Sequence, residues 1–184
     1  MTDRFHIITG GPGSGKSSLI AALAAADWNH QPEGGRAIIQ DQVASGGNAL
    51  PWADRAAFAD RMLAWDLRSY RAAMTRPGPV IFDRGIPDVI GYRDLCGLPI
   101  PDKLARAAQT RRYARHVFIA PYWPAIFAQD AERKQDLAEA LATHDAMVRT
   151  YSALGYILVP LPRATVKGRV DFVLAHLRAA APGL

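Results

Sequence analysis

The sequence has few of the features that cross-link a chain or place it in a membrane. Its 184 residues include one cysteine, Cys96, so an intrachain disulfide is impossible and a cysteine-based metal site is excluded. No apolar run approaches the ~20 residues that a membrane span requires. The first residues, MTDRFHIITGG, also lack the layout of a signal peptide. We therefore expect a cytoplasmic protein without a membrane partner.

The sequence also lacks any long run of like charge. The net charge is +5 and the isoelectric point is about 9.7, but the basic residues are scattered and form no nucleic-acid-binding stripe. A nucleic-acid partner is therefore not expected. The hypothesis of a nucleic-acid-linked ATPase has only the high isoelectric point in its support. The length and ordinary globular composition indicate a single domain over residues 1–184, as a monomer or a homodimer.

Short apolar runs alternate with longer helical patterns along the chain. The strands predicted from these runs cover residues 5–9, 37–40, 80–82, 116–120 and 156–161. The predicted helices cover residues 16–26, 52–74, 86–96, 102–114, 125–153 and 165–180. This alternation is typical of βαβ units. It predicts an α/β fold of three αβα layers with a parallel sheet.

A glycine-rich segment follows the first predicted strand. It fits the phosphate-loop pattern G-x-x-x-x-G-K-[ST] and reads Gly10-Gly11-Pro12-Gly13-Ser14-Gly15-Lys16-Ser17. Glycines let consecutive backbone N–H groups turn inward around an anion, and the helix that follows adds its dipole. We expect Gly11 to Ser18, including Ser18 itself, to bind the triphosphate of ATP or GTP. Lys16 would reach the β- and γ-phosphates, and the Ser17 hydroxyl would ligate Mg²⁺.

A carboxylate and an arginine follow the apolar run Val80-Ile81-Phe82. In phosphate-loop proteins an aspartate at the end of such a strand supports the metal, so Asp83 is the candidate second contact to Mg²⁺; the alternative is that it caps the next helix. Arg84 stands where motor-type ATPases carry a glutamate that activates water. This substitution favours phosphoryl transfer to an acceptor, with Arg84 contacting the acceptor or the transferring group.

Several of these segments resemble the kinase-like branch of phosphate-loop proteins. The turn Phe82-Asp83-Arg84-Gly85 resembles the Asp-Arg turn of thymidylate kinases and the Glu-Arg turn of deoxynucleoside kinases. The segments GGPGSGKSS, GNALPW, VIFDRGIPDVIGY and FIAPYWPAIFAQDAERKQD resemble a family of small bacterial AAA-like, ATP-binding proteins grouped with the nicotinamide riboside kinase domain. The resemblance implies the phosphate-loop NTPase fold with strand order 2-3-1-4-5 and a small helical lid at about residues 122–140. It implies no particular substrate.

Three further residues are candidates for the acceptor, the lid and the base of the nucleotide. Asp41 ends the predicted second strand, where a carboxylate could orient an acceptor hydroxyl for attack; a cap of a loop or helix is the alternative. Arg133 lies in the expected lid and could neutralise the γ-phosphate; a solvated helix face with internal ion pairs is the alternative. Arg163 follows the fifth strand, so it could contact adenine.

These residues together favour a kinase that transfers the γ-phosphoryl group of Mg²⁺·ATP to a small-molecule acceptor, nucleoside-like by resemblance. The alternative is a nucleotide-dependent switch or regulatory ATPase that has no small-molecule acceptor. ATP is expected over GTP because no Asn-Lys-x-Asp element follows the fourth predicted strand.

Overall fold

The computed structural model describes residues 3–126 and 137–180. Within them, five strands form one parallel sheet in the order β2-β3-β1-β4-β5, as expected from the sequence. The strands are β1 (Phe5–Gly10), β2 (Asn29–Gln31), β3 (Val80–Asp83), β4 (His116–Ala120) and β5 (Ile157–Pro160). The phosphate-loop strand β1 therefore lies at the centre of the sheet, beside the strand that ends in Asp83.

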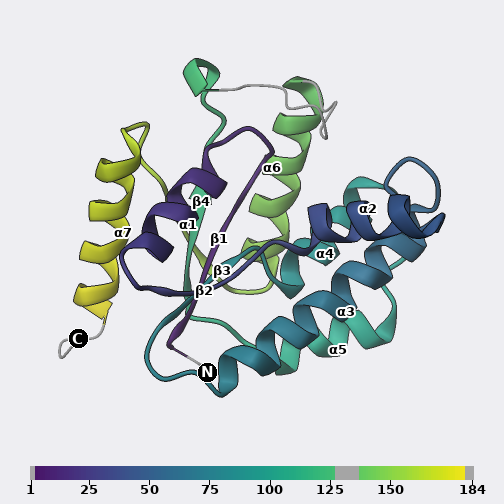
Figure 1. Cartoon of the computed structure of the whole chain (residues 1–184), viewed down its shortest axis with the longest axis horizontal. Coiled ribbons are helices and arrows are strands. Elements are labelled where there is room, and N and C mark those ends of the chain that lie inside the picture. The colour runs from purple at the N-terminus through teal and green to yellow at the C-terminus, as the bar shows by residue number, and fades with distance from the viewer. Residues whose placement is uncertain (1–2, 127–136, 181–184) are drawn as a thin grey trace.

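Helices cover both faces of the sheet and give three layers (Figure 1). Helices α1 (Lys16–Ala25) and α7 (Val166–Ala180) pack on one face. The other face carries α3 (Arg55–Met74), α4 (Ile86–Leu95), α5 (Asp102–Thr110) and α6 (Leu137–Ala153). Two elements lie outside these layers, namely α2 (Gly34–Ser45), which packs beside α3, and the short 3-10 helix η1 (Pro124–Ile126). Among the described residues, no helix is both long and apolar enough to cross a membrane.

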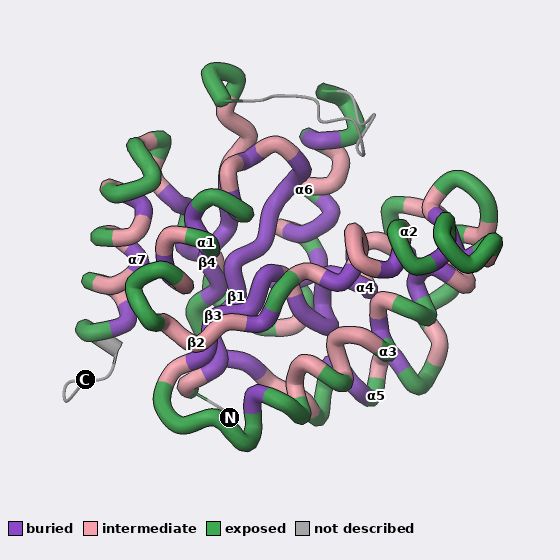
Figure 2. Tube along the Cα trace, in the orientation of Figure 1, coloured by how far each residue is buried: buried purple, intermediate pink, exposed green. Residues whose placement is uncertain are grey.

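The three central strands β1, β3 and β4 are buried on both sides, so their sequences are almost continuously apolar instead of alternating. In β1, Phe5 and Ile7 join the core beneath α3 to α6, while Ile8 joins the core beneath α1 and α7. Figure 2 shows this burial along β1 and β3. Because both faces of these strands are buried, their residues form the apolar runs at 5–9 and 80–82 from which the strands were predicted.

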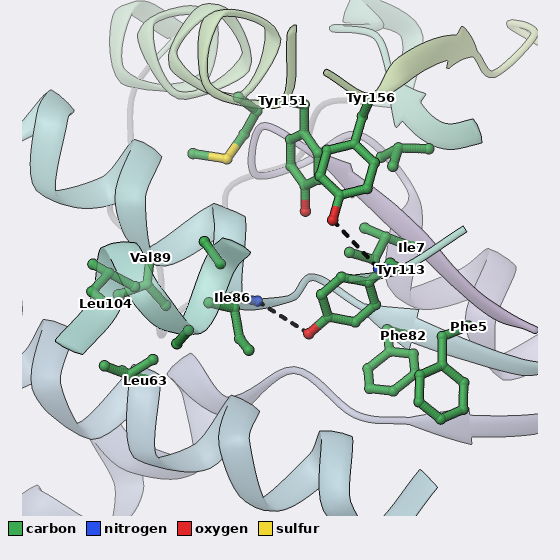
Figure 3. Close-up of a cluster of buried hydrophobic side chains, with 14 of the residues drawn as sticks. Phe5, Ile7, Leu63, Phe82, Ile86, Val89, Leu104, Tyr113, Tyr151 and Tyr156 are labelled. Atoms are coloured by element: carbon green, nitrogen blue, oxygen red, sulfur yellow. Dashed lines mark hydrogen bonds between the residues drawn. The ribbon is translucent and has the colours of Figure 1, made fainter. Parts of the chain in front are cut away.

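The larger core contains a set of buried aromatic rings that reaches the start of α4 (Figure 3). The Tyr113 ring packs edge-on against Phe82, with centroids 5.2 Å apart. Its hydroxyl accepts a hydrogen bond of 3.3 Å from the backbone N–H of Ile86, and the Tyr156 hydroxyl accepts one from the Tyr113 N–H. The aromatic core therefore supports the first turn of the helix that follows Asp83.

The second strand lies elsewhere than the sequence predicted. Residues 37–40 belong to helix α2, whereas β2 is formed by three polar residues, Asn29, His30 and Gln31. An edge strand pairs with only one neighbour, here β3, so it needs no long apolar run. The run at 37–40 is apolar because Ile38 is buried in this helix, which ends at Ser45 and is capped by Gly46 with a φ of 67°.

The helix predicted over residues 125–153 is confirmed only in its second part. The structure has η1 at Pro124–Ile126 and α6 from Leu137 onward, while residues 127–136 lie outside the described part of the chain. The lid expected at about 122–140 falls largely on that stretch.

A core substitution tests this packing. Leu104 is 1% exposed and lies on α5 in the larger core, whereas Leu141 on α6 is 41% exposed. We expect Leu104→Ala to lower the free energy of unfolding by about 2–5 kcal/mol and Leu141→Ala to lower it by under about 1 kcal/mol. Urea denaturation monitored by tryptophan fluorescence measures both, and equal losses would contradict the packing described here.

Candidate active site

The phosphate loop joins β1 to α1, and its shape requires glycine. Gly13 and Gly15 have φ angles of 67° and 80°, in the left-handed region that glycine adopts without strain. A side chain at Gly11 would overlap the carbonyl oxygen of Ala140, at the start of α6. The loop is therefore seated closely against α6 as well as on the sheet.

Lys16 lies inside this loop. Its Nζ donates hydrogen bonds to the Gly11 carbonyl at 2.6 Å and to the Ser14 Oγ at 3.1 Å. The residue is 5% exposed, whereas Ser17 and Ser18, in the first turn of α1, are exposed. This arrangement places a buried cation and two accessible hydroxyls at the N-terminus of one helix, as anion and metal binding require.

Asp83 ends β3 beside the phosphate loop, since it pairs in register with Ile8 of β1. It is 8% exposed, and its Oδ1 is buried without a hydrogen-bond partner among the described residues. Burial, and then the charge of Glu33, raise the pKa of Asp83 to about 6, against the opposing effects of Lys16 and Arg84. An unsatisfied buried carboxylate oxygen is a fitting ligand for a hard cation such as Mg²⁺.

Arg84 is fixed between two carboxylates. Its Nε lies 3.3 Å from the Glu33 Oε1, and its Nη1 lies 3.2 Å from the Asp88 Oδ1. Its backbone has a φ of 69°, which is unusual outside glycine. Glu33 directly precedes α2, so the arginine links the turn after β3 to the loop after β2.

Asp88 holds the other side of this turn. Its Oδ2 accepts hydrogen bonds from the Gly85 N–H at 3.0 Å and from the Tyr151 hydroxyl at 2.5 Å. Its Oδ1 accepts one of 2.5 Å from Thr9 Oγ1 of β1. The residue is 6% exposed, so one buried carboxylate ties β1, the Asp-Arg turn and α6 together.

A cavity of about 560 Å³ adjoins the loop and the turn. Pro12 of the phosphate loop forms part of its lining. The lining also includes Glu33, Asp66, Arg84 and Asp88, which interact with one another. Its apolar wall includes Trp52, Phe58, Met62, Val89, Tyr92 and Met147. The volume and the largely apolar lining are those of a small-molecule site.

Comparison with known proteins places this fold and loop in a family. A family model described as an AAA domain matches residues 5–169. The chain belongs to this AAA-domain family. No curated protein matches its sequence.

Solved structures share the fold of this family member. The NadR protein in complex with NR matches with a TM-score of 0.70 and 15% identity, over 99% of this chain and 51% of NadR. This chain thus spans about half the length of NadR. Thymidylate kinase from Ehrlichia chaffeensis matches with a TM-score of 0.63 and 15% identity, over 97% of this chain and 100% of that one. Deoxyadenosine kinase from M. mycoides matches with a TM-score of 0.65 and 13% identity, over 95% and 99%. The fold is therefore that of the phosphate-loop kinases, as the sequence resemblance implied.

The premise for Asp41 as a catalytic residue was wrong. Asp41 does not end a strand but lies exposed on α2, where its carboxylate accepts a hydrogen bond from the neighbouring Gln42. It does not line the cavity. Arg133 lies outside the described residues, and Arg163 donates a 3.2 Å hydrogen bond to the Tyr122 carbonyl at the surface. Of the predicted site residues, the structure brings Lys16, Asp83 and Arg84 together.

Sequence reasoning missed Glu33, Asp66 and Asp88 at the cavity, and Arg169 behind the loop. Asp88 had a signal, because an acidic residue three positions after Gly85 fits a capping pattern. Arg169 of α7 donates a 2.7 Å hydrogen bond to the Ser14 carbonyl and stacks on Trp123 at 5.1 Å. It is 2% exposed, so it holds the phosphate loop from the side opposite to α6.

The raised pKa of Asp83 predicts a pH dependence of stability. Because the fold binds this proton more tightly than the unfolded chain does, the stabilisation is complete below the ordinary pKa of 3.8 and is lost as the pH rises through about 6. Relative to wild type, Asp83→Asn should therefore gain about 2–3 kcal/mol of unfolding free energy between about pH 4 and about pH 8.

Urea denaturation without metal or nucleotide measures this difference. Asp60→Asn, at a carboxylate that is 49% exposed on α3, is the control for a general effect of removing one charge. A difference for Asp83→Asn that stays constant across this pH range would contradict the prediction.

Proposed function

We propose that this protein is a Mg²⁺·ATP-dependent kinase that transfers the γ-phosphoryl group to a small molecule bound in the cavity. One observation carries the proposal: Pro12 of the phosphate loop lines the cavity, and so do Glu33 and Arg84, which both act on Asp83. A kinase needs two substrates placed end to end, and this arrangement supplies adjacent sites for them.

The residues of the loop have distinct tasks in this proposal. Backbone N–H groups of residues 11–18 and the Lys16 ammonium would bind the triphosphate. Ser17 and Asp83 would hold Mg²⁺, which supplies neutralisation of the phosphate charge when bound. The unpartnered Oδ1 of Asp83 supports this assignment.

Glu33 takes the role that the sequence suggested for Asp41. An acceptor hydroxyl in the cavity would pass its proton to the Glu33 carboxylate as its oxygen forms a bond to the γ-phosphorus. The bond from that phosphorus to the β-phosphate oxygen breaks, and ADP leaves. Arg84 would stabilise the charge on the transferring group through its fork of N–H donors.

A transfer screen with γ-labelled ATP tests the proposal. We expect label in a small-molecule product from a panel of nucleosides, sugars, cofactor precursors and their phosphates. Label recovered only as inorganic phosphate would contradict the kinase and favour a regulatory ATPase.

Paired substitutions then separate the two candidate bases. We expect Glu33→Gln and Arg84→Ala each to lower kcat by about 10²-fold or more, and Asp41→Asn to leave it within about twofold, because Asp41 is exposed on α2. Binding of a fluorescent ATP analogue and the melting temperature check that each variant is folded. A larger loss in Asp41→Asn than in Glu33→Gln would contradict the assignment.

A further inference from the structure

Arg169 of α7 carries a buried positive charge next to the phosphate loop. The residue is 2% exposed. Its Nη1 donates a 2.7 Å hydrogen bond to the Ser14 carbonyl, and its Nε donates one of 2.9 Å to the carbonyl of Pro162, which lies between β5 and α7. The third nitrogen, Nη2, is buried without a hydrogen-bond partner among the described residues. The guanidinium therefore binds neutral carbonyl groups, and part of its hydrogen-bonding capacity is unused.

The charge of this guanidinium has no carboxylate partner in the described part of the chain. The guanidinium stacks instead on the ring of Trp123, whose centroid lies 5.1 Å from the Arg169 Cζ. An aromatic ring attracts a cation but does not cancel its charge. Burial accordingly lowers the pKa of Arg169. A buried charge without a counter-ion is costly, so an anion brought by a ligand would stabilise it.

A second buried arginine shows the usual arrangement. Arg93 of α4 is 5% exposed, and its Nε also donates to a backbone carbonyl, that of Pro99. Its Nη1, however, lies 3.4 Å from the Oδ1 of Asp60 and forms an ion pair with it. Arg169 matches Arg93 in burial and in its carbonyl contact. Within residues 3–126 and 137–180, it differs by having no such carboxylate.

The contact with Ser14 acts on one peptide group of the phosphate loop. A trans peptide group is planar, and its C=O and N–H point in opposite directions. The described residues contain no cis peptide bond. Because the Ser14 carbonyl points to Arg169, the N–H of Gly15 points away from the guanidinium. A charged donor on the carbonyl also polarises the peptide group and strengthens this N–H as a donor to an anion.

Arg169 is fitted closely to the loop. A Cβ at Gly15 would lie 3.1 Å from the Arg169 Nη1 and 2.9 Å from the Ile126 Cδ1, so a side chain at this position would meet both. Ser14 is itself 2% exposed, and its Oγ accepts a hydrogen bond from the Lys16 Nζ. Lys16 and Arg169 therefore hold the same loop residue, and the buried charge reaches the loop through short contacts.

We infer that Arg169 is a positioning residue for the nucleotide: it orients and polarises the Ser14–Gly15 peptide toward the phosphates, and these phosphates supply the counter-charge of its guanidinium. The inference rests on the proposed function because the phosphate loop must bind a nucleotide, but it does not depend on the acceptor. The coupling is reciprocal, since Arg169 favours phosphate binding and bound phosphate stabilises the buried charge. It acts on the phosphates and not on the base.

Binding measurements on the full chain test the inference without requiring turnover. Calorimetry compares the Mg²⁺ complexes of a non-hydrolysable ATP analogue and of inorganic tripolyphosphate, which carries phosphates but no base. Arg169→Gln keeps a neutral donor, and Arg169→Lys keeps a charged one. We expect Arg169→Gln to weaken both ligands by about tenfold or more, because a charge-assisted contact is lost, and Arg169→Lys to stay within about threefold of wild type.

A second substitution on α7 is the matched control. Lys167→Met also removes one positive charge from this helix, but the Lys167 side chain is 84% exposed and pairs with Asp171. We expect it to change the affinity for either ligand by less than about twofold. The melting temperature without ligand checks that each variant is folded.

Four results would overturn the inference. They are unchanged binding in Arg169→Gln, an equal loss in Lys167→Met, a loss of tenfold or more in a folded Arg169→Lys, and a loss for the ATP analogue that leaves tripolyphosphate binding unchanged. A residue that only tethers α7 to the loop would not separate a neutral donor from a charged one. If Arg169→Gln does not fold, the comparison of Arg169→Lys with wild type decides.

Failure of this inference can be distinguished from failure of the proposed function. If the protein binds the ATP analogue with the expected dependence on Arg169 but transfers label to no acceptor, the positioning role stands and the kinase proposal is wrong. If label reaches a small molecule and Arg169→Gln binds both ligands as wild type does, the kinase proposal stands and the positioning role is wrong.

Discussion

The carboxylate of Asp88 joins the three parts of the fold that the site needs. It accepts hydrogen bonds from Thr9 of the phosphate-loop strand, from Gly85 and Arg84 of the turn after β3, and from Tyr151 of α6. Four donors share one buried group, so its position fixes the turn relative to the loop. Loss of this carboxylate would leave several buried donors unsatisfied at once, which is among the most costly changes in a protein interior.

This anchor also explains how Arg84 keeps a strained backbone. A positive φ outside glycine costs on the order of 1 kcal/mol, and the ion pairs with Glu33 and Asp88 offset it. The guanidinium is consequently held in the lining of the cavity, close to Asp83.

The sequence predicted the parts of this site that depend on local patterns. The phosphate loop is visible because its glycines, lysine and serine are consecutive, and Asp83 is visible because it ends a buried apolar strand. β2 escaped prediction because a three-residue edge strand of polar residues carries no pattern. This error placed Asp41 at the end of a strand, whereas it lies on α2. Asp66 could not be found either, since only the packing of α3 against the turn brings it near Asp88 and Arg84.

Helix α6 relates the two halves of the site to each other. Ala140 at its start lies against Gly11 of the loop, Met147 lines the cavity, and Tyr151 binds Asp88. One helix therefore contacts the phosphate loop, the cavity and the Asp-Arg turn. Residues of α2 and α3 also line the cavity, and α2 packs on α3. We therefore expect a displacement of α6 to affect the phosphate loop and the cavity together, whereas a displacement of α2 acts first on the cavity that its residues line.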